Sequence, residues 1–134
     1  MADETVRVVS TSGDGLRVEA STRLHTWVGD EHASDDLPEP AGPDPFAQLL
    51  GALGSCMTMT VRMYVERKEW ALDAVRVELT GEREQAQPLE RVRVQLSLEG
   101  DLDDDQRARI LTISQCCPVH RTLAPTVAIE TVLT

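Results

Sequence analysis

The chain has 134 residues, a formal net charge of −10 and only 3% aromatic residues. This length predicts a single domain over residues 1–134, with a core built from Val, Leu, Ala, Met and Ile. The negative charge would repel phosphate backbones and anionic headgroups, which argues against nucleic acid and membrane surfaces as partners. The expected partner is a small molecule or a second copy of the chain.

The cysteines and the N-terminus indicate the compartment. The start, MADETVRV, has no basic region followed by an apolar segment, so we expect no signal peptide and a cytoplasmic protein. In a reducing compartment, three cysteines favour reactive or metal-binding roles over a structural disulfide framework.

The N-terminal part of the chain has the pattern of short strands. Residues 4–10 and 15–21 alternate in polarity on either side of the turn-forming run Ser12-Gly13-Asp14-Gly15, which predicts a hairpin. Residues 22–29 are expected to add a third strand. Residues 30–42 are acidic and proline-containing, so they are expected to form a loop.

A long helix is predicted next, from Pro45 to Lys68. Asp44 can cap its first free N–H groups, and Pro45 stands where a missing N–H costs nothing. Apolar residues from Phe46 to Val65 recur at three- and four-residue steps, and Cys56 shares their stripe. The small residues around Cys56 indicate that something packs close to the backbone. The helix would be about 36 Å long, which is long for a domain of this size.

The second half predicts two more strands, a helix and a final strand. Residues 73–80 and 90–98 alternate cleanly and form a hairpin. Residues 102–115 begin with acidic side chains, as helices do, and residues 126–134 form the last strand. The element order is that of an α+β fold with a sheet layer and a helix layer.

Two cysteines stand at the end of that second helix. Pro118 disfavours helical conformation at the residue before it, so Cys117 is expected at a flexible corner between helix and loop. Cys116 is expected to be the last buried residue of the helix. A lone cysteine on an apolar face, such as Cys56, is usually only part of a core.

The cysteines also suit a redox function. A thiolate that attacks a peroxide becomes a sulfenic acid, and a second thiol can condense with it; Cys56 and Cys117 form a candidate pair. An attacking cysteine needs a cation or hydrogen-bond donor beside it, for which Arg23, His25 and His120 are candidates. Cys56, Cys117 and His120 are also ligand types that suit zinc, but no fourth ligand is evident and one C-x-x-H is a weak signal.

Two longer motifs resemble a known family. The run GPDPFAQLLGALGSCMTMTVRMYVERKEW, followed after a hairpin by GDLDDDQRARILTISQCCPVHRTL, is similar to the OsmC-like branch of the OsmC/Ohr family, the osmotically inducible and organic hydroperoxide resistance proteins. Leu24-His25 before Gly29-Asp30-Glu31 resembles the segment that precedes the helix in that branch. The likeness covers nearly the whole chain in the right order.

The resemblance implies a fold, an assembly and an activity. It implies an antiparallel sheet packed on a long central helix, in an intertwined homodimer with the active site at its interface. It also implies reduction of organic hydroperoxides without metal, haem or flavin, with a dithiol or thioredoxin-like protein as reductant. By motif, Cys56 matches the peroxidatic cysteine and Cys117 the resolving one, and Arg23 is the best candidate for the family's arginine.

The sequence departs from the family at several positions: the family's arginine is not clearly matched, and its Asp-Glu-Pro segment appears here as Asp30-Glu31-His32. Peroxidases of the family carry a Glu near the start of the central helix, whereas Phe46-Ala47-Gln48 stands here. Since preorganised charge supplies much of the rate in such sites, we expect an activity that is weak or directed at another substrate. The alternative is a dimer that binds an apolar small molecule without catalysis, in which the cysteines only pack. A Cys56 thiol that ionises at unusually low pH would favour the enzyme.

Overall fold

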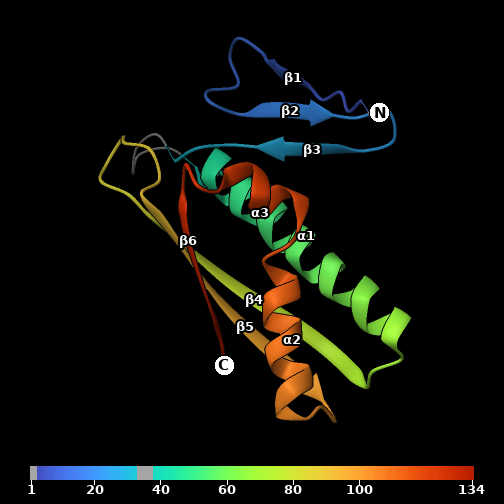
Figure 1. Cartoon of the computed structure of the whole chain (residues 1–134). Coiled ribbons are helices and arrows are strands. Elements are labelled where there is room, and N and C mark those ends of the chain that lie inside the picture. The colour runs from blue at the N-terminus through green and yellow to red at the C-terminus, as the bar shows by residue number, and fades with distance from the viewer. Residues whose placement is uncertain (1–2, 33–37) are drawn as a thin grey trace. The chain divides into compact units, whose positions relative to one another are not determined.

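The computed structural model describes residues 3–32 and 38–134. The chain separates into two compact units, which meet in sequence between Leu49 and Leu50 and are described one at a time. The elements follow the predicted α+β order, with one addition, and are shown in Figure 1: β1 (Arg7–Ser10), β2 (Val18–Ser21), β3 (Thr26–Gly29), α1 (Pro45–Lys68), β4 (Leu72–Glu82), β5 (Arg91–Gly100), α2 (Asp104–Ser114), α3 (Pro118–Leu123) and β6 (Ala128–Leu133).

The first unit is a three-stranded antiparallel sheet in the order β1-β2-β3. The predicted hairpin is confirmed, and Gly13 and Gly15 take positive φ angles in its turn. The third strand is shorter than predicted because the chain first turns back on itself: the Thr22 N–H donates to the His25 carbonyl at 2.8 Å. Of the predicted loop 30–42, residues 33–37 lie outside the described residues.

Helix α1 begins and ends where the sequence predicts, at Pro45 and Lys68. A carboxylate oxygen of Asp44 accepts a hydrogen bond from the N–H of Ala47 at 2.7 Å, so Asp44 caps the helix as expected. At the other end, Glu69 has a positive φ of 57° and turns the chain toward β4. The capping residues therefore fix both ends of the helix.

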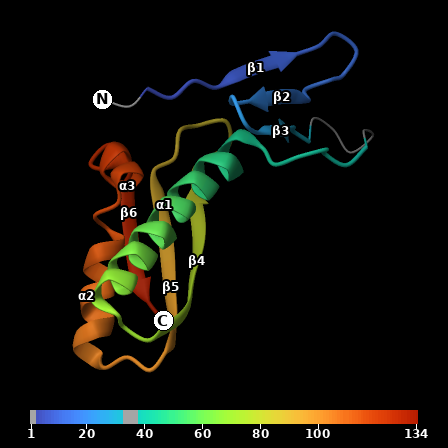
Figure 2. The ribbon, with the colours of Figure 1, turned by 90° about the vertical axis from the view of Figure 1, so that its right-hand side faces the viewer.

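The second unit pairs a sheet with helices on one face. Strand β5 lies between β4, which is antiparallel to it, and β6, which is parallel, so the expected antiparallel sheet is in fact mixed. Val92, Val94 and Leu96 are fully buried on one face of β5. They pack against buried side chains of α1 and α2, which lie side by side in Figures 1 and 2. Burial of each such side chain contributes about 1.5–3 kcal/mol.

Small residues allow α1 to approach the sheet. A Cβ added at Gly54 would lie 2.8 Å from a methyl group of Leu79 and 3.3 Å from one of Val77, both on β4. At Gly51 the same atom would meet nothing within 4 Å. The inference of close packing is therefore confirmed for Gly54, whereas the described residues give no packing reason for Gly51.

The C-terminal region contains an element that the sequence pattern did not predict. Helix α2 begins with a capping box between Asp103 and Gln106, close to the predicted start. After it, the predicted flexible corner at Cys117 is wrong, because Pro118 to Leu123 form the short helix α3. Pro118 is the first residue of that helix, where its missing N–H costs nothing.

Candidate thiol site

Cys56 lies in the middle of α1, at the border of its buried face. Leu53 and Met57, which lie on the same side of it around the helix, are fully buried, while the Cys56 side chain is partly exposed. Its side chain packs against the cluster that contains Val92, Val94 and Cys117. The thiol therefore combines an apolar environment with access from outside.

Cys117 is fully buried in the same cluster. It is the N-cap of α3, and its sulfur accepts a hydrogen bond from the backbone N–H of His120 at 3.2 Å. An N-cap side chain is fixed by the start of its helix, so this thiol is held in one place rather than carried on a flexible corner.

The structure brings the two thiols together from positions far apart in sequence. Burial raises the pKa of Cys117 to about 11, against the lowering effect of the His120 N–H, and a hydrogen bond to Cys56 raises it further. At neutral pH Cys117 therefore keeps its proton, and its side chain lies in the same cluster as that of Cys56. Two cysteine side chains in one cluster can form a disulfide once one sulfur is oxidised and the other attacks it.

The three candidate cations have different positions. Burial lowers the pKa of His120, so its imidazole is neutral at neutral pH and supplies no positive charge. Its Nε2 is buried, with no hydrogen-bond partner in the described part of the chain. Arg23 and His25 are exposed in the turn before β3, where they line a shallow pocket of about 290 Å³. The pairing of Arg23 with Cys56 stays a prediction.

Cys116 differs from the prediction. It was expected to be buried at the end of α2, but it is exposed, because the helix ends at Ser114 and the fully buried Ser114 side chain takes the inward position. The Cys116 thiol lies 3.4 Å from the carbonyl oxygen of Thr112, to which it donates. Cys116 therefore stands apart from the pair of Cys56 and Cys117.

The start of α1 has no carboxylate at residues 46–48, where the resemblance places one. Gln48 instead uses both ends of its amide: its oxygen accepts from the Trp27 indole N–H, and its nitrogen donates to the Pro43 carbonyl, each at 3.0 Å. A Cβ on Gly29 would approach the Gln48 nitrogen to 2.6 Å, so a glycine at that position leaves room for the amide. Gln48 therefore links α1 to the segments before it.

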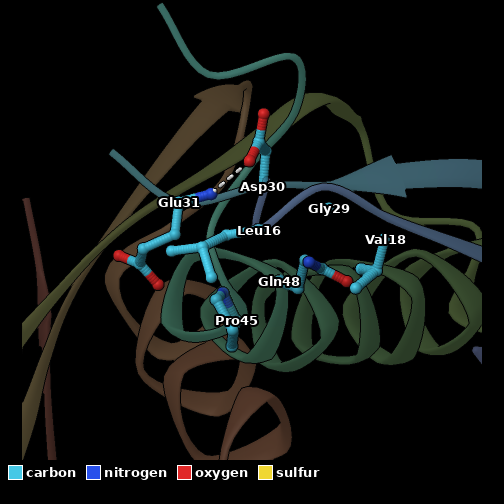
Figure 3. A pocket seen from close by; sticks show the side chains of 7 residues that line it. All are labelled: Leu16, Val18, Gly29, Asp30, Glu31, Pro45 and Gln48. Carbon is cyan, nitrogen blue, oxygen red and sulfur yellow. Dashed lines mark hydrogen bonds between the residues drawn. The ribbon is translucent and has the colours of Figure 1, made fainter. Parts of the chain in front are cut away.

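Gln48 also lines a pocket of about 220 Å³ within the first unit (Figure 3). Figure 3 shows Leu16 next to Glu31 and Pro45, whereas Gln48 lies next to Val18. Asp30 accepts hydrogen bonds from the N–H groups of Glu31 and Ala41, at 2.8 and 2.9 Å. These two hydrogen bonds lower the pKa of Asp30 and keep it ionised, and the bond from Ala41 has the larger effect. Asp30 thereby joins the two ends of the acidic loop.

One further group was not indicated by any sequence pattern. Tyr64 of α1 accepts a hydrogen bond from Arg109 of α2 at 3.2 Å, a contact between residues 45 positions apart. The two residues lie in different motifs and neither motif pairs them, so only the packing of α1 against α2 reveals the contact. As to metals, no three His, Cys, Asp or Glu side chains within residues 3–32 and 38–134 gather in a way that could hold an ion.

Comparison with known families identifies the chain. A family model described as OsmC-like protein matches residues 35–132, well over half of the sequence. The chain belongs to this family. The resemblance noted in the two cysteine motifs is thereby confirmed. An uncharacterized protein of Haloferax volcanii is 29% identical over 98 residues, which are 72% of this chain and 74% of that protein.

Solved structures share the fold. The OsmC-like protein of Mycoplasma pneumoniae matches with a TM-score of 0.84 at 17% identity, over 99% of this chain and 96% of that one. The organic hydroperoxide resistance protein OhrB of Bacillus subtilis matches with a TM-score of 0.72 at 10% identity, over 99% and 98%. At these identities the likeness shows the OsmC-like fold alone. No helix in the described residues has the length and apolar character to cross a bilayer.

Proposed function

We propose that the protein is a thiol-dependent peroxidase that reduces organic hydroperoxides with Cys56 and Cys117. The observation that carries this proposal is the contact between the two thiols, one partly exposed and the other buried and protonated. Membership of a family in which some proteins are named for organic hydroperoxide resistance supports the same chemistry.

The proposed cycle balances in three steps. The Cys56 thiolate attacks the terminal oxygen of the hydroperoxide; the O–O bond breaks, Cys56 becomes a sulfenic acid, and the alkoxide takes up a proton to leave as an alcohol. The sulfur of Cys117 then attacks that of Cys56, forming a disulfide while hydroxide leaves and takes the Cys117 proton as water. A dithiol or thioredoxin-like protein reduces the disulfide and regenerates both thiols.

The fixed position of Cys117 supports the second step. Its sulfur already contacts Cys56, and the His120 N–H that points at it stabilises negative charge as the proton leaves. We keep Arg23 as the proposed cation for the first step, on the family resemblance. Arg23→Gln should then slow the oxidation of Cys56 by peroxide without slowing the reduction of a preformed disulfide.

The proposed enzyme acts as a homodimer. Helix α1 is 24 residues long, and Met59 and Met63 on it are 64% and 71% exposed, although apolar side chains of this size are usually covered. A second copy packed on this face would cover them. Light scattering at a series of protein concentrations measures this: a mass of twice 14.8 kDa is expected, and a monomer throughout would contradict the assembly.

The test of the function is non-reducing peptide mapping after one equivalent of cumene hydroperoxide. We expect rapid loss of two thiols and a disulfide that joins the peptides of Cys56 and Cys117, with Cys116 still free. Cys117→Ser should stop the cycle at a sulfenic acid on Cys56, which a dimedone-type probe traps. The matched control is Cys116→Ser, which should form the same disulfide as the native chain. Survival of all three thiols would overturn the proposal.

A second candidate function is favoured by the start of α1. Residues 46–48 carry no carboxylate, and the Gln48 amide is occupied by two hydrogen bonds. A site without this charge suits a dimer that binds an apolar small molecule and performs no chemistry. The peptide mapping separates the two functions, because a binding protein leaves its thiols reduced under conditions in which the peroxidase forms the disulfide.

A further inference from the structure

The sulfur of Cys117 has two structural roles at the start of α3. It belongs to the cluster that contains Cys56, and as the N-cap it accepts the backbone N–H of His120 at 3.2 Å. A disulfide demands a different position of this sulfur. Two sulfurs in a disulfide lie about 2.05 Å apart with a restricted torsion angle, so Cys56 rather than the helix start then decides where the Cys117 sulfur lies.

The two helices next to this sulfur differ in how firmly they are held. Helix α1 has 24 residues, and its buried side chains include Leu53 and Met57 near Cys56. Helix α3, which follows α2 in Figure 1, has only 6 residues, and none of these described residues is buried. Helices this short are unstable alone, so α3 depends on its cap and on the packing of Val119 and Leu123 in the thiol cluster. When the sulfurs join, α3 is therefore the element that yields.

The side chain of His120 also favours an open α3. Its Nε2 is buried and has no hydrogen-bond partner within residues 3–32 and 38–134. A buried polar atom without a partner costs free energy, which is recovered when water reaches the atom. Burial lowers the pKa of the imidazole as well, as expected where the surroundings disfavour charge. Exposure of α3 to solvent removes both penalties.

We propose that formation of the Cys56–Cys117 disulfide opens the first turn of α3, and that this opening gives the reductant access to the Cys117 sulfur. The inference rests on the proposed function, because it concerns regeneration of the same thiol pair. In the reduced protein the thiol caps the helix and is fully buried. In the oxidised protein the cap hydrogen bond is broken and the His120 N–H binds water.

The opened state allows thiol–disulfide exchange at Cys117. A thiolate of a dithiol reductant attacks the Cys117 sulfur, the bond to Cys56 breaks, and Cys56 leaves as a thiolate that takes up a proton. The second thiol of the reductant then displaces Cys117, and the two reductant sulfurs form a disulfide. Cys117 regains a proton and its hydrogen bond from the His120 N–H, so the thiol pair and the closed helix are restored together.

The test is hydrogen–deuterium exchange, followed by mass spectrometry in the reduced and the oxidised protein. Diamide takes two electrons and two protons from a pair of thiols, so it forms the disulfide whether or not the protein reduces peroxides. Non-reducing peptide mapping shows that the bond joins Cys56 and Cys117. Loss of an N-cap should speed exchange in residues 118–127 about fivefold, while exchange in residues 104–114 of α2 stays unchanged.

Variants separate the lost cap from other effects of oxidation. Cys117→Ala removes the acceptor without a disulfide, so its reduced form should exchange in α3 like the oxidised native protein. Cys117→Ser keeps a capping oxygen and should stay protected with and without diamide. His120→Leu removes the unpartnered nitrogen and should slow exchange in α3 about fivefold in both states. Its matched control is Arg121→Leu, at the neighbouring exposed position, which should have no such effect.

The proposal is overturned by equal exchange of residues 118–127 in the two states, by an equal rise in α2, or by a Cys117→Ala variant as protected as the reduced native protein. Failure of diamide to join Cys56 and Cys117 also overturns it. Equal effects of His120→Leu and Arg121→Leu would contradict the role of His120. A disulfide that diamide forms and cumene hydroperoxide does not would instead contradict the peroxidase and leave the opening of α3 intact. Circular dichroism of each variant excludes global unfolding as the cause of faster exchange.

Discussion

Cys116 and Cys117 are neighbours in sequence but belong to different regions of the second unit. Cys117 is fully buried, caps α3 and contacts Cys56, whereas Cys116 is exposed in a pocket lined by Arg67. The difference arises because α2 ends just before them and Pro118 starts a new helix just after them, so the chain turns at this point. Residue type alone therefore does not determine thiol chemistry; the helix boundaries decide which sulfur is protected.

The largest expected difference between the two regions is in activity. Cys56→Ser should reduce hydroperoxide consumption to the background rate, because a hydroxyl at this position cannot replace a thiolate as the attacking group. Cys116→Ser should retain nearly the native rate. A ferrous-oxidation assay of remaining cumene hydroperoxide measures both. Comparable loss in the two variants would mean that Cys116 takes part in peroxide reduction and would remove the distinction between the regions.

The second largest expected difference is in the stability that each of the adjacent cysteines contributes. Cys117→Ala removes an N-cap acceptor and leaves a small void in the core, for which we expect a loss of about 1–2 kcal/mol in the free energy of unfolding. Cys116→Ala changes an exposed side chain and should stay within about 0.5 kcal/mol of the native protein. Urea unfolding at one protein concentration measures both, since the stability of the proposed dimer would depend on concentration. Equal losses would contradict the difference in burial.

The pH dependence of stability should follow the raised pKa of Cys117. In the unfolded chain this thiol ionises at its ordinary pKa, about 8.5, whereas in the folded chain it stays protonated until about pH 11. The unfolded state therefore loses its proton first, and stability falls as the pH rises through this window. We expect the native protein to lose more stability between pH 8.5 and 10.5 than Cys117→Ala does. Parallel curves for the two proteins would show that the thiol is not held protonated by the fold.

Signals within a short stretch of sequence predicted the features that depend on neighbouring residues, such as helix starts and the buried faces of strands. Asp44 and Pro45 marked the start of α1, and the alternation of Val92, Val94 and Leu96 marked the buried face of β5. Pairings between distant segments had no such signal. The parallel addition of β6 and the contact of Tyr64 with Arg109 depend on tertiary packing alone.

The thiol site was predicted in part. The motifs indicated both Cys56 and Cys117, and their contact agrees with the proposed pairing. The prediction that Cys117 lies at a flexible corner was wrong. Helix α3 has only 6 residues and is too short to show a helical period, although Pro118 is a recognisable start signal. The exposure of Cys116 followed from the same boundary. Arg23 was proposed from family resemblance, and no pattern in the sequence tests it.

The smallest expected effect concerns the two faces of α1. Gly51→Ala adds a methyl group where nothing lies within 4 Å, so the better helix propensity of alanine should raise stability by about 0.5–1 kcal/mol. Gly54→Ala gains the same propensity, but its methyl group would press on Leu79 and Val77, which should cancel the gain or reverse it. Urea unfolding and light scattering of both variants test this. If Gly51→Ala instead weakens the proposed dimer, the second copy would cover α1 as far as Gly51; if it stabilises the protein without changing its mass, the proposed interface would lie farther along the helix, around Met59 and Met63.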